Sequence, residues 1–319
     1  MNWEEYWNKL LTDHKLKTSV EEMNEVDIRI GSGENIEHIC HEIYDHYSTW
    51  KSTCEIVKNN FWKIVENFGG VHLHTSRIKS IDSLLVKIIT KRYTMLMDKH
   101  SKYAGIDSGN YRNIITDLIG LRLIINYRGH WKDIHDEILC EFPYDSKQKY
   151  EVDKLLPHYA DKQYQAEIPK VYYAEGDNIR QYVECGLLPK KHKMDYRSIH
   201  YTISFQQVYI ELQIRTIYDE AWSDCDHNYV YKKQDNRSHI ALEKISKTLS
   251  KLTNLSNDIG EQMKDIFDDE LIVVGSDMWK TTQEVIDEWD KAIERIEEVG
   301  NDIKELRKKM IVINEGAEN

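Results

Sequence analysis

The sequence predicts an α+β fold, a mixed β-sheet flanked by helices, with helical extensions on its N- and C-terminal sides. Three observations predict this fold. Apolar residues recur at helical spacing through the first hundred residues, β-branched runs replace that period between residues 118 and 216, and the helical period returns from residue 218 onward. Helices, then strands, then helices are typical of α+β proteins and differ from a repeating βαβ pattern.

The N-terminal region is predicted to be helical, because its apolar side chains return every three or four positions. Helices are expected at residues 3–11, 36–62 and 83–97. We assign residues 1–69 to an N-terminal helical region. The C-terminal region, residues 236–319, shows the same period and predicts long helices at 239–267 and 279–310.

The central region, residues 70–235, is predicted to hold the sheet as one domain. Only Gln206 and Gln207 separate its last two strands, so an antiparallel hairpin is expected. Residues 143–169 are charged and irregular, and we expect them to form a mobile surface connection. The predicted elements are strands at 118–127, 171–174, 198–205 and 208–216 and a helix at 131–142.

Composition narrows the class of protein. The 319 residues include 43 Lys and Arg against 55 Asp and Glu, a formal net charge of −12. This balance argues against a general nucleic-acid coat but permits a local basic pocket. The five cysteines lie far apart without a CxxC pair, which predicts free thiols in a reducing compartment. With no signal peptide and no apolar run of ~20 residues, we expect a cytoplasmic protein without a membrane partner.

The strand at 208–216 carries the most informative side chains. Because side chains alternate along a strand, Glu211, Gln213 and Arg215 share the face opposite the apolar row. An acid, an amide and a fixed cation are thereby held a few ångströms apart. A solvent-exposed polar face is the alternative, and this strand considered alone favours it.

The hairpin partner at 198–205 places Ser198 and His200 on one side and follows the most basic stretch of the chain. Lysines bind phosphates, and a tyrosine at the end of a basic loop can stack on a nucleobase. A solvated loop anchored by its tyrosine is the alternative. The residues of this stretch that we single out are Lys190, Lys191, Lys193 and Tyr196.

A second basic patch begins at Arg77 and Lys79. Ser80 or Ser83 is expected to cap the helix that follows, with Lys87 one turn beyond. A helix N-terminus beside cations is a phosphate site, although a capped surface helix would also explain this pattern.

Asp117 stands at the entrance of the predicted buried strand, ahead of Arg122. Together with Glu211 from another strand, it would offer Mg²⁺ two hard oxygen ligands. A turn residue is the alternative for a lone aspartate.

Taken in order, these segments resemble the synthetase domain of the RelA/SpoT nucleotide pyrophosphokinases over about residues 70–235. The chain resembles a synthetase-only form, without a hydrolase domain. The matching blocks are Arg77-Ile-Lys-Ser80 with Ser83 and Lys87, Asp117-Leu-Ile-Gly-Leu-Arg122, Tyr196-Arg-Ser-Ile-His-Tyr201, Glu211-Leu-Gln-Ile-Arg-Thr216, and Ala221-Trp-Ser-Asp-Cys-Asp-His227 with Tyr231.

The resemblance implies a nucleotidyltransferase-like sheet and a defined reaction. The β,γ-pyrophosphate of ATP would move to the ribose 3′-hydroxyl of GDP or GTP, giving the alarmone (p)ppGpp and AMP. Asp117 would ligate Mg²⁺, and Glu211 would position and deprotonate the acceptor hydroxyl while also touching the metal. Arg122 is counted with these two as catalytic.

The resemblance also divides the other residues between the two substrates. ATP would contact Arg77, Lys79, Ser80, Lys87 and Arg215. Tyr196 would stack on the acceptor purine, and the remaining acceptor contacts would come from Lys190, Lys191, Lys193, Ser198, His200 and Gln213.

The acceptor and two alternatives to this function stay open. Many family members carry Lys-Pro-Asn-Gly before the acceptor tyrosine, where this chain has His192-Lys-Met-Asp195, so the acceptor is undecided. A toxin or defence member would make (p)ppApp or pyrophosphorylate the 3′ end of tRNA, although the net charge weighs against a polyanion. A scaffold is the third hypothesis, in which the C-terminal helices fold back on the same chain or pair in a homo-oligomer. An antitoxin partner would also bind through these helices.

Overall fold

The computed structural model describes residues 1–30, 35–94, 103–145, 147–151, 154–158, 162–192, 194–230 and 239–272, with single positions at 287, 291, 294, 301 and 305. Within these ranges, no helix combines the length and the apolar character that crossing a membrane requires.

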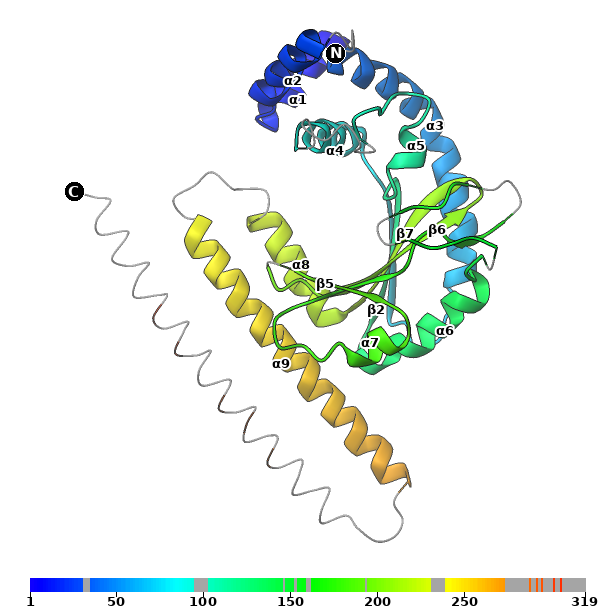
Figure 1. Cartoon of the computed structure of the whole chain (residues 1–319). Coiled ribbons are helices and arrows are strands. Elements are labelled where there is room, and N and C mark those ends of the chain that lie inside the picture. Colours follow the sequence, from blue (N-terminus) through cyan, green and yellow to red (C-terminus); the bar gives the residue numbers. More distant parts are fainter. Residues whose placement is uncertain are drawn as a thin grey trace, which may run out of the picture.

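A seven-stranded mixed sheet occupies the middle of the molecule (Figure 1). Its strand order is β1-β2-β7-β6-β4-β5, and β3 pairs with β6 beside this path. The β2–β7 and β4–β5 pairs are parallel, and the other neighbours are antiparallel. The strands are β1 (Leu73–Ile78), β2 (Ile119–Ile125), β3 (Tyr164–Gln165), β4 (Lys170–Tyr173), β5 (Leu188–Lys191), β6 (Ser198–Phe205) and β7 (Val208–Thr216).

Helices precede, interrupt and follow the sheet. In Figure 1, α1, α2 and α4 gather near the N-terminus, α3 runs along the sheet, and α8 lies against α9. The helices are α1 (Trp3–Asp13), α2 (Lys17–Ile30), α3 (Ile36–Val65), α4 (Ile81–Thr94), α5 (Tyr111–Ile114), the 3₁₀-helix η1 (Arg128–His130), α6 (Trp131–Glu141), α7 (Arg180–Glu184), α8 (Ile217–Tyr229) and α9 (His239–Ile272).

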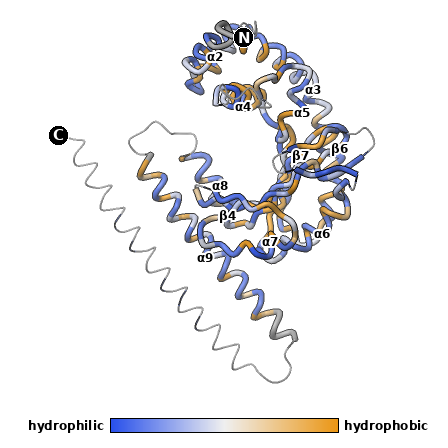
Figure 2. The backbone as a smooth tube through the Cα atoms, in the orientation of Figure 1, coloured by the Kyte–Doolittle hydropathy of each residue, from blue (hydrophilic) through white to orange (hydrophobic). Residues whose placement is uncertain are grey.

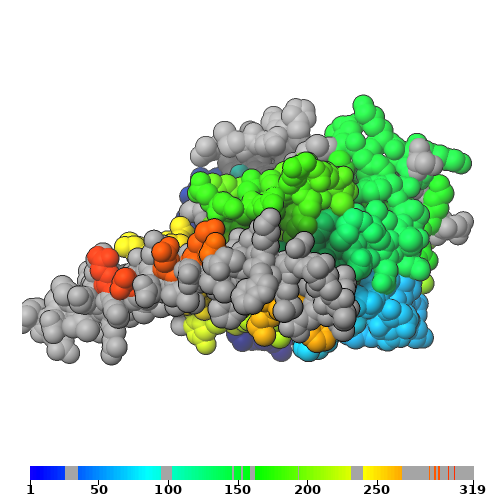
Figure 3. Space-filling model, turned by 90° about the horizontal axis from the view of Figure 1, so that it is seen from below, coloured from blue at the N-terminus to red at the C-terminus, as the bar shows by residue number. Residues whose placement is uncertain are grey.

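The core lies on the apolar face of the sheet, beneath α3 and α6. Phe61 of α3 packs with its ring centroid 5.2 Å from Phe205 of β6 and 5.0 Å from Phe142, which follows α6. The view from below shows α3 (light blue) against the segment of α6 (green) in Figure 3. Hydrophobic residues are concentrated in the central strands (Figure 2). Helices therefore cover one face, and the polar row of β7 lies on the other.

Most predicted elements are confirmed. The hairpin strands have the expected bounds, and β2, β4, α1, α3, α6 and α9 agree to within a few residues. The helical interpretation of the first hundred residues is wrong at β1, because four successive polar residues, 74–77, leave no apolar period to detect in this short edge strand. The predicted helix at 279–310 lies outside the described residues, apart from single positions.

Two loop predictions are wrong. Lys190 and Lys191 end strand β5, which pairs in parallel with β4, so they do not belong to a loop. Within 143–169, the short strand β3 is fully buried rather than a surface connection. Gln165 is fixed there by two hydrogen bonds. Its side-chain amide donates to the backbone carbonyl of Phe142 at 2.9 Å, and its backbone carbonyl accepts from the Tyr150 hydroxyl at 2.6 Å. A two-residue strand held by side-chain bonds carries no periodic signal.

The hairpin turn is strained. Gln206 and Gln207 have φ angles of 47° and 61°, which are left-handed values that cost a residue with a Cβ about 1–2 kcal/mol. We expect Gln207→Gly to raise the free energy of unfolding by roughly 0.5–1 kcal/mol in urea denaturation, since glycine adopts this conformation readily. Gln207→Ala is the control, because it keeps a Cβ. An equal gain from alanine would contradict this explanation.

Candidate functional site

The strand register aligns the candidate residues on the polar face of the sheet. Gly120 of β2 lies beside Glu211 of β7, and Arg122 lies beside Gln213. Across the hairpin, His200 of β6 is opposite Gln213. The pairing of β1, β2, β7 and β6 therefore brings residues from distant parts of the chain into adjacent rows.

Arg77 of β1 extends this row, because its register partner is Gly120. The Arg77 side chain lies over Gly120, because a Cβ there would be 3.4 Å from its Nε. A cavity of about 220 Å³ lies over this part of the sheet. Its lining residues are Thr75, Ser76, Arg77, Gly120, Leu121, Arg122, Glu211 and Gln213.

Asp117 is held between two lysines. Nζ of Lys79 and Nζ of Lys87 each lie 2.8 Å from one of its carboxylate oxygens, and the aspartate side chain is only 13% exposed. Burial alone would raise the pKa of Asp117, but Lys87 and Lys79 hold it below its usual value. Ser80 caps α4 by accepting the Ser83 N–H at 3.2 Å, as the sequence predicts. The patch is therefore preorganised around an ionised carboxylate.

Glu211 is also kept ionised. Burial opposes its charge, but His200, Lys87 and Gln213 together lower the pKa of Glu211 from 4.5 to about 2. Nδ1 of His200 lies 3.4 Å from one carboxylate oxygen, and the Gln213 amide donates to the other at 2.7 Å. Because Lys87 acts on both acids, Asp117 and Glu211 share one electrostatic environment.

This depressed pKa predicts a dependence of stability on pH. Glu211 stabilises the fold fully above its unfolded-state pKa of about 4.5, and this contribution is lost as pH falls through about 2. By pH 3 we expect wild type to lose about 2 kcal/mol that Glu211→Gln does not lose. Urea denaturation of both proteins at pH 6 and pH 3 measures the difference. Parallel losses in the two proteins would contradict the assigned shift.

The acceptor-side candidates lie further along the same face. The ring of Tyr196 lies 4.9 Å from the Arg215 guanidinium carbon, and Ser198 accepts from Nε of Arg215 at 3.3 Å. Burial raises the pKa of Tyr196, so its phenol stays protonated at neutral pH. The structure brings together four residues that the resemblance assigns to the acceptor, Tyr196, Ser198, His200 and Gln213. Arg215, which the resemblance assigns to ATP, lies among them.

The lysines of the basic stretch are separated from one another. Lys190 shares a row with Tyr172 and Ser198 on the polar face, at the far edge of the sheet. Lys191 alternates to the other face, where its Nζ lies 3.2 Å from Glu175. Lys193 lies outside the described residues.

Glu220 is a site residue that the sequence analysis does not single out. Its carboxylate, in the first turn of α8, lies 2.5 Å from Arg122 and 2.7 Å from Arg215. An acid in the first turn of a helix is common for electrostatic reasons alone. Glu220 could have been identified only from the pairing of β2 with β7, which places Arg122 opposite Gln213 and two positions from the partner of Arg215.

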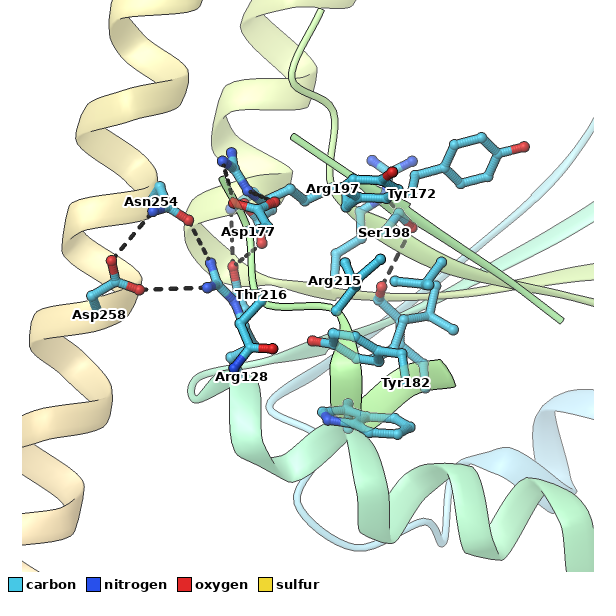
Figure 4. A pocket seen from close by; sticks show the side chains of 18 of the residues that line it. Arg128, Tyr172, Asp177, Tyr182, Arg197, Ser198, Arg215, Thr216, Asn254 and Asp258 are labelled. Carbon is cyan, nitrogen blue, oxygen red and sulfur yellow. Dashed lines mark hydrogen bonds and ion pairs between the residues drawn. The ribbon is translucent and has the colours of Figure 1, made fainter. Parts of the chain in front are cut away.

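A larger cavity of about 580 Å³ lies at the carboxyl ends of β2 and β7, against α9 (Figure 4). Arg128 donates to Asn254 of α9 at 2.9 Å, while Arg197 forms a two-bond ion pair with Asp177 at 2.8 and 2.9 Å. Arg197 also donates to Ser250 of α9 at 3.0 Å. Polar contacts therefore join α9 to the residue that follows Tyr196.

The donor set of the site suits Mg²⁺. Asp117 and Glu211 supply two carboxylates, and Mg²⁺ in phosphoryl-transfer sites is bound by one or two carboxylates together with substrate phosphates and waters. No cluster of three or more His, Cys, Asp or Glu side chains occurs in the described part of the chain that could hold a metal unaided. A metal bound here would thus depend on substrate oxygens.

The sequence also matches a known protein family. A family model described as the region found in RelA / SpoT proteins matches residues 76–236. A search of curated proteins finds no match.

Solved structures similar to this chain include three bacterial proteins. One is smu.1046c from Streptococcus mutans UA159, with 16% identity, a TM-score of 0.45, and coverage of 72% of this chain and 100% of that one. Another is a GTP pyrophosphokinase family protein from Streptococcus pneumoniae, with 16% identity, a TM-score of 0.43, and coverage of 72% and 97%. The small alarmone synthetase 1 from Bacillus subtilis, bound to its product pppGpp, has 15% identity, a TM-score of 0.38, and coverage of 71% and 93%.

Proposed function

The chain belongs to the family of proteins that share the region found in RelA and SpoT, and we propose that it transfers the β,γ-pyrophosphate of ATP to the 3′-hydroxyl of GDP or GTP. The product would be (p)ppGpp, with AMP released. In this proposal residues 70–235 are the synthetase domain, between helical regions at 1–69 and 236–319.

One observation carries the proposal. Two ionised carboxylates, Asp117 and Glu211, share an electrostatic environment with Lys79 and Lys87, and Glu211 lines the cavity over the sheet. Transfer of a phosphoryl-type group requires positioning and charge neutralisation more than covalent chemistry. Fixed cations beside two acids meet that requirement.

The ATP side of the site is the patch around Arg77. Arg77, Lys79 and Lys87 would bind the triphosphate through charge-assisted hydrogen bonds, with Ser80 at the start of α4. Arg122 lines the same cavity and would neutralise charge that develops during transfer. When bound, Mg²⁺ would be held by Asp117 and Glu211 and would polarise the phosphate oxygens.

The acceptor side is the row that begins at Tyr196. Tyr196 would stack on the purine, and His200 and Gln213, which both contact Glu211, would place the ribose. Glu211 would accept a hydrogen bond from the 3′-hydroxyl and orient it for in-line attack. Lys190, which shares a row further along this face with the buried Ser198, would contact the acceptor phosphates.

The test is transfer of label from β,γ-labelled ATP to separate acceptors. We expect label on GDP or GTP, together with one AMP for each pyrophosphate transferred. Label on the 3′-hydroxyl of a second ATP molecule would replace the guanine acceptor with an adenine nucleotide. Absence of transfer to GDP, GTP, ATP or deacylated tRNA would refute the proposed activity.

A second candidate, transfer to the 3′ end of tRNA, is favoured by one basic cavity. This cavity of about 550 Å³ lies between β5 and α9. It is lined by Asp195 and Arg197, the residues on either side of Tyr196 in the sequence. Its walls include Lys191, Lys247 and Lys251. Such a surface suits an acceptor with a phosphate chain longer than that of a nucleotide. Label on deacylated tRNA in the same assay would select this candidate.

A further inference from the structure

Arg215 has no donor left for a phosphate. Its side chain is 4% exposed, and a guanidinium offers five N–H groups. Nε donates to Ser198, one terminal nitrogen donates to Glu220 and Ser223, and the other donates to Tyr196 and Gln213. Binding a phosphate would break bonds that the buried guanidinium needs.

Two chains of hydrogen bonds run from Arg215 to Glu211. In one, Arg215 donates to the Tyr196 hydroxyl, which lies 2.9 Å from Nε2 of His200, and Nδ1 of His200 faces one Glu211 oxygen at 3.4 Å. In the other, Arg215 donates to Oε1 of Gln213 at 2.5 Å, and Gln213 donates to the second Glu211 oxygen at 2.7 Å. With His200 protonated on Nδ1, every donor in both chains points from the cation toward the anion.

Glu220 fixes the origin of both chains. One of its oxygens contacts Arg215 and the other contacts Arg122, so a single carboxylate joins the arginine of the acceptor side to the arginine of the ATP cavity. The carboxylate is 17% exposed and lies in the first turn of α8, where the helix dipole favours a negative charge.

We propose that Arg215 and Glu220 are positioning residues that orient the Glu211 carboxylate through Tyr196–His200 and Gln213, in place of the ATP contact expected for Arg215 from the sequence. This inference rests on the proposed function, because it assigns Glu211 the role of orienting the acceptor hydroxyl. Hydrogen bonds aligned in one direction polarise one another, so the ends of each chain are coupled.

Three variants test the proposal by steady-state kinetics. Arg215→Lys keeps the charge but loses the fork of donors, and we expect the turnover number to fall about 100-fold with KM for ATP changed less than about 3-fold. Tyr196→Phe keeps the ring for stacking but breaks one chain, with an expected fall of about 10-fold. Because both changes act on one chain, the double variant should lose less than the product of the two single effects. The exposed Arg180→Lys is the matched control, and we expect it to behave as wild type.

Glu220→Gln removes the bridge between the two arginines, and we expect it to lower the turnover number by a larger factor than it changes KM for ATP or for the acceptor. A rise in KM for ATP alone in Arg215→Lys, with an unchanged turnover number, would overturn the proposal in favour of a phosphate contact.

A measurement without turnover separates this inference from the proposed function. Nitrogen-15 NMR of the His200 imidazole, assigned with His200→Gln, reports which ring nitrogen carries the proton. We expect Nδ1 to be protonated in wild type, with a shifted Nε2 resonance in Tyr196→Phe and Arg215→Lys. An Nε2 resonance that is the same in all three proteins would refute the hydrogen-bond chain even if wild type transfers pyrophosphate. The expected shifts in a protein that transfers nothing would refute only the proposed function.

Discussion

Glu211→Gln is expected to lower the turnover number about 10³-fold or more and also to lower the melting temperature at pH 7, because the variant lacks the ionised carboxylate that stabilises wild type. The amide keeps the shape of the side chain but loses the charge that His200 and Lys87 stabilise. It also presents N–H donors to His200 and Gln213, which are arranged to donate. Initial rates of AMP release at saturating ATP and acceptor measure the effect.

The matched control for this substitution is Glu184→Gln, which removes an exposed carboxylate that pairs with Arg180 on the surface of α7. We expect it to retain the wild-type rate, because exposed pairs contribute little to stability. Near-wild-type turnover in Glu211→Gln would remove Glu211 from the reaction and leave the scaffold reading in its place.

Asp117→Asn is the second large effect, with an expected loss of about 10²-fold in turnover and a higher requirement for Mg²⁺. The variant leaves Lys79 and Lys87 partly buried without the carboxylate that lies 2.8 Å from each. Removing one partner from a buried ionic group is destabilising, so we also expect the free energy of unfolding to fall by roughly 2 kcal/mol. Magnesium titrations of the initial rate and urea denaturation measure the two effects.

Asp136→Asn is the control for the aspartate, because Asp136 pairs with Lys132 on the exposed surface of α6. It should change neither the metal requirement nor the stability by a measurable amount. If Asp117→Asn needed no more Mg²⁺ than wild type, Asp117 would be a structural partner of the two lysines and not a metal ligand.

The fold was predictable where the chain repeats a pattern over many residues. The hairpin at 198–216 has alternating side chains long enough to fix both strand and register, and the structure confirms its bounds. β1, β3 and β5 are short edge or side strands whose pairing is set by distant partners. Their own residues carry little periodic information, so they could not be predicted from local sequence.

The site was predictable at the level of residue types and incomplete at the level of contacts. Motif residues such as Glu211 and Asp117 stand in short blocks that a reader of the sequence can recognise. The occupied donors of Arg215 and the bridging position of Glu220 depend on how β2, β7 and α8 are placed. Contacts of this kind join residues far apart in sequence, so no local sequence pattern predicts them.

The parallel pairing of β2 with β7 determines how early the candidate site can form during synthesis. Arg77 and Asp117 leave the ribosome long before Glu211. Strand β2 can pair with β7 only once residues 210–216 have also been synthesised. A nascent chain that ends before the hairpin therefore contains Lys79 and Lys87 but lacks Glu211. Such non-local strand pairing also slows folding, so the site is expected to be completed late in folding.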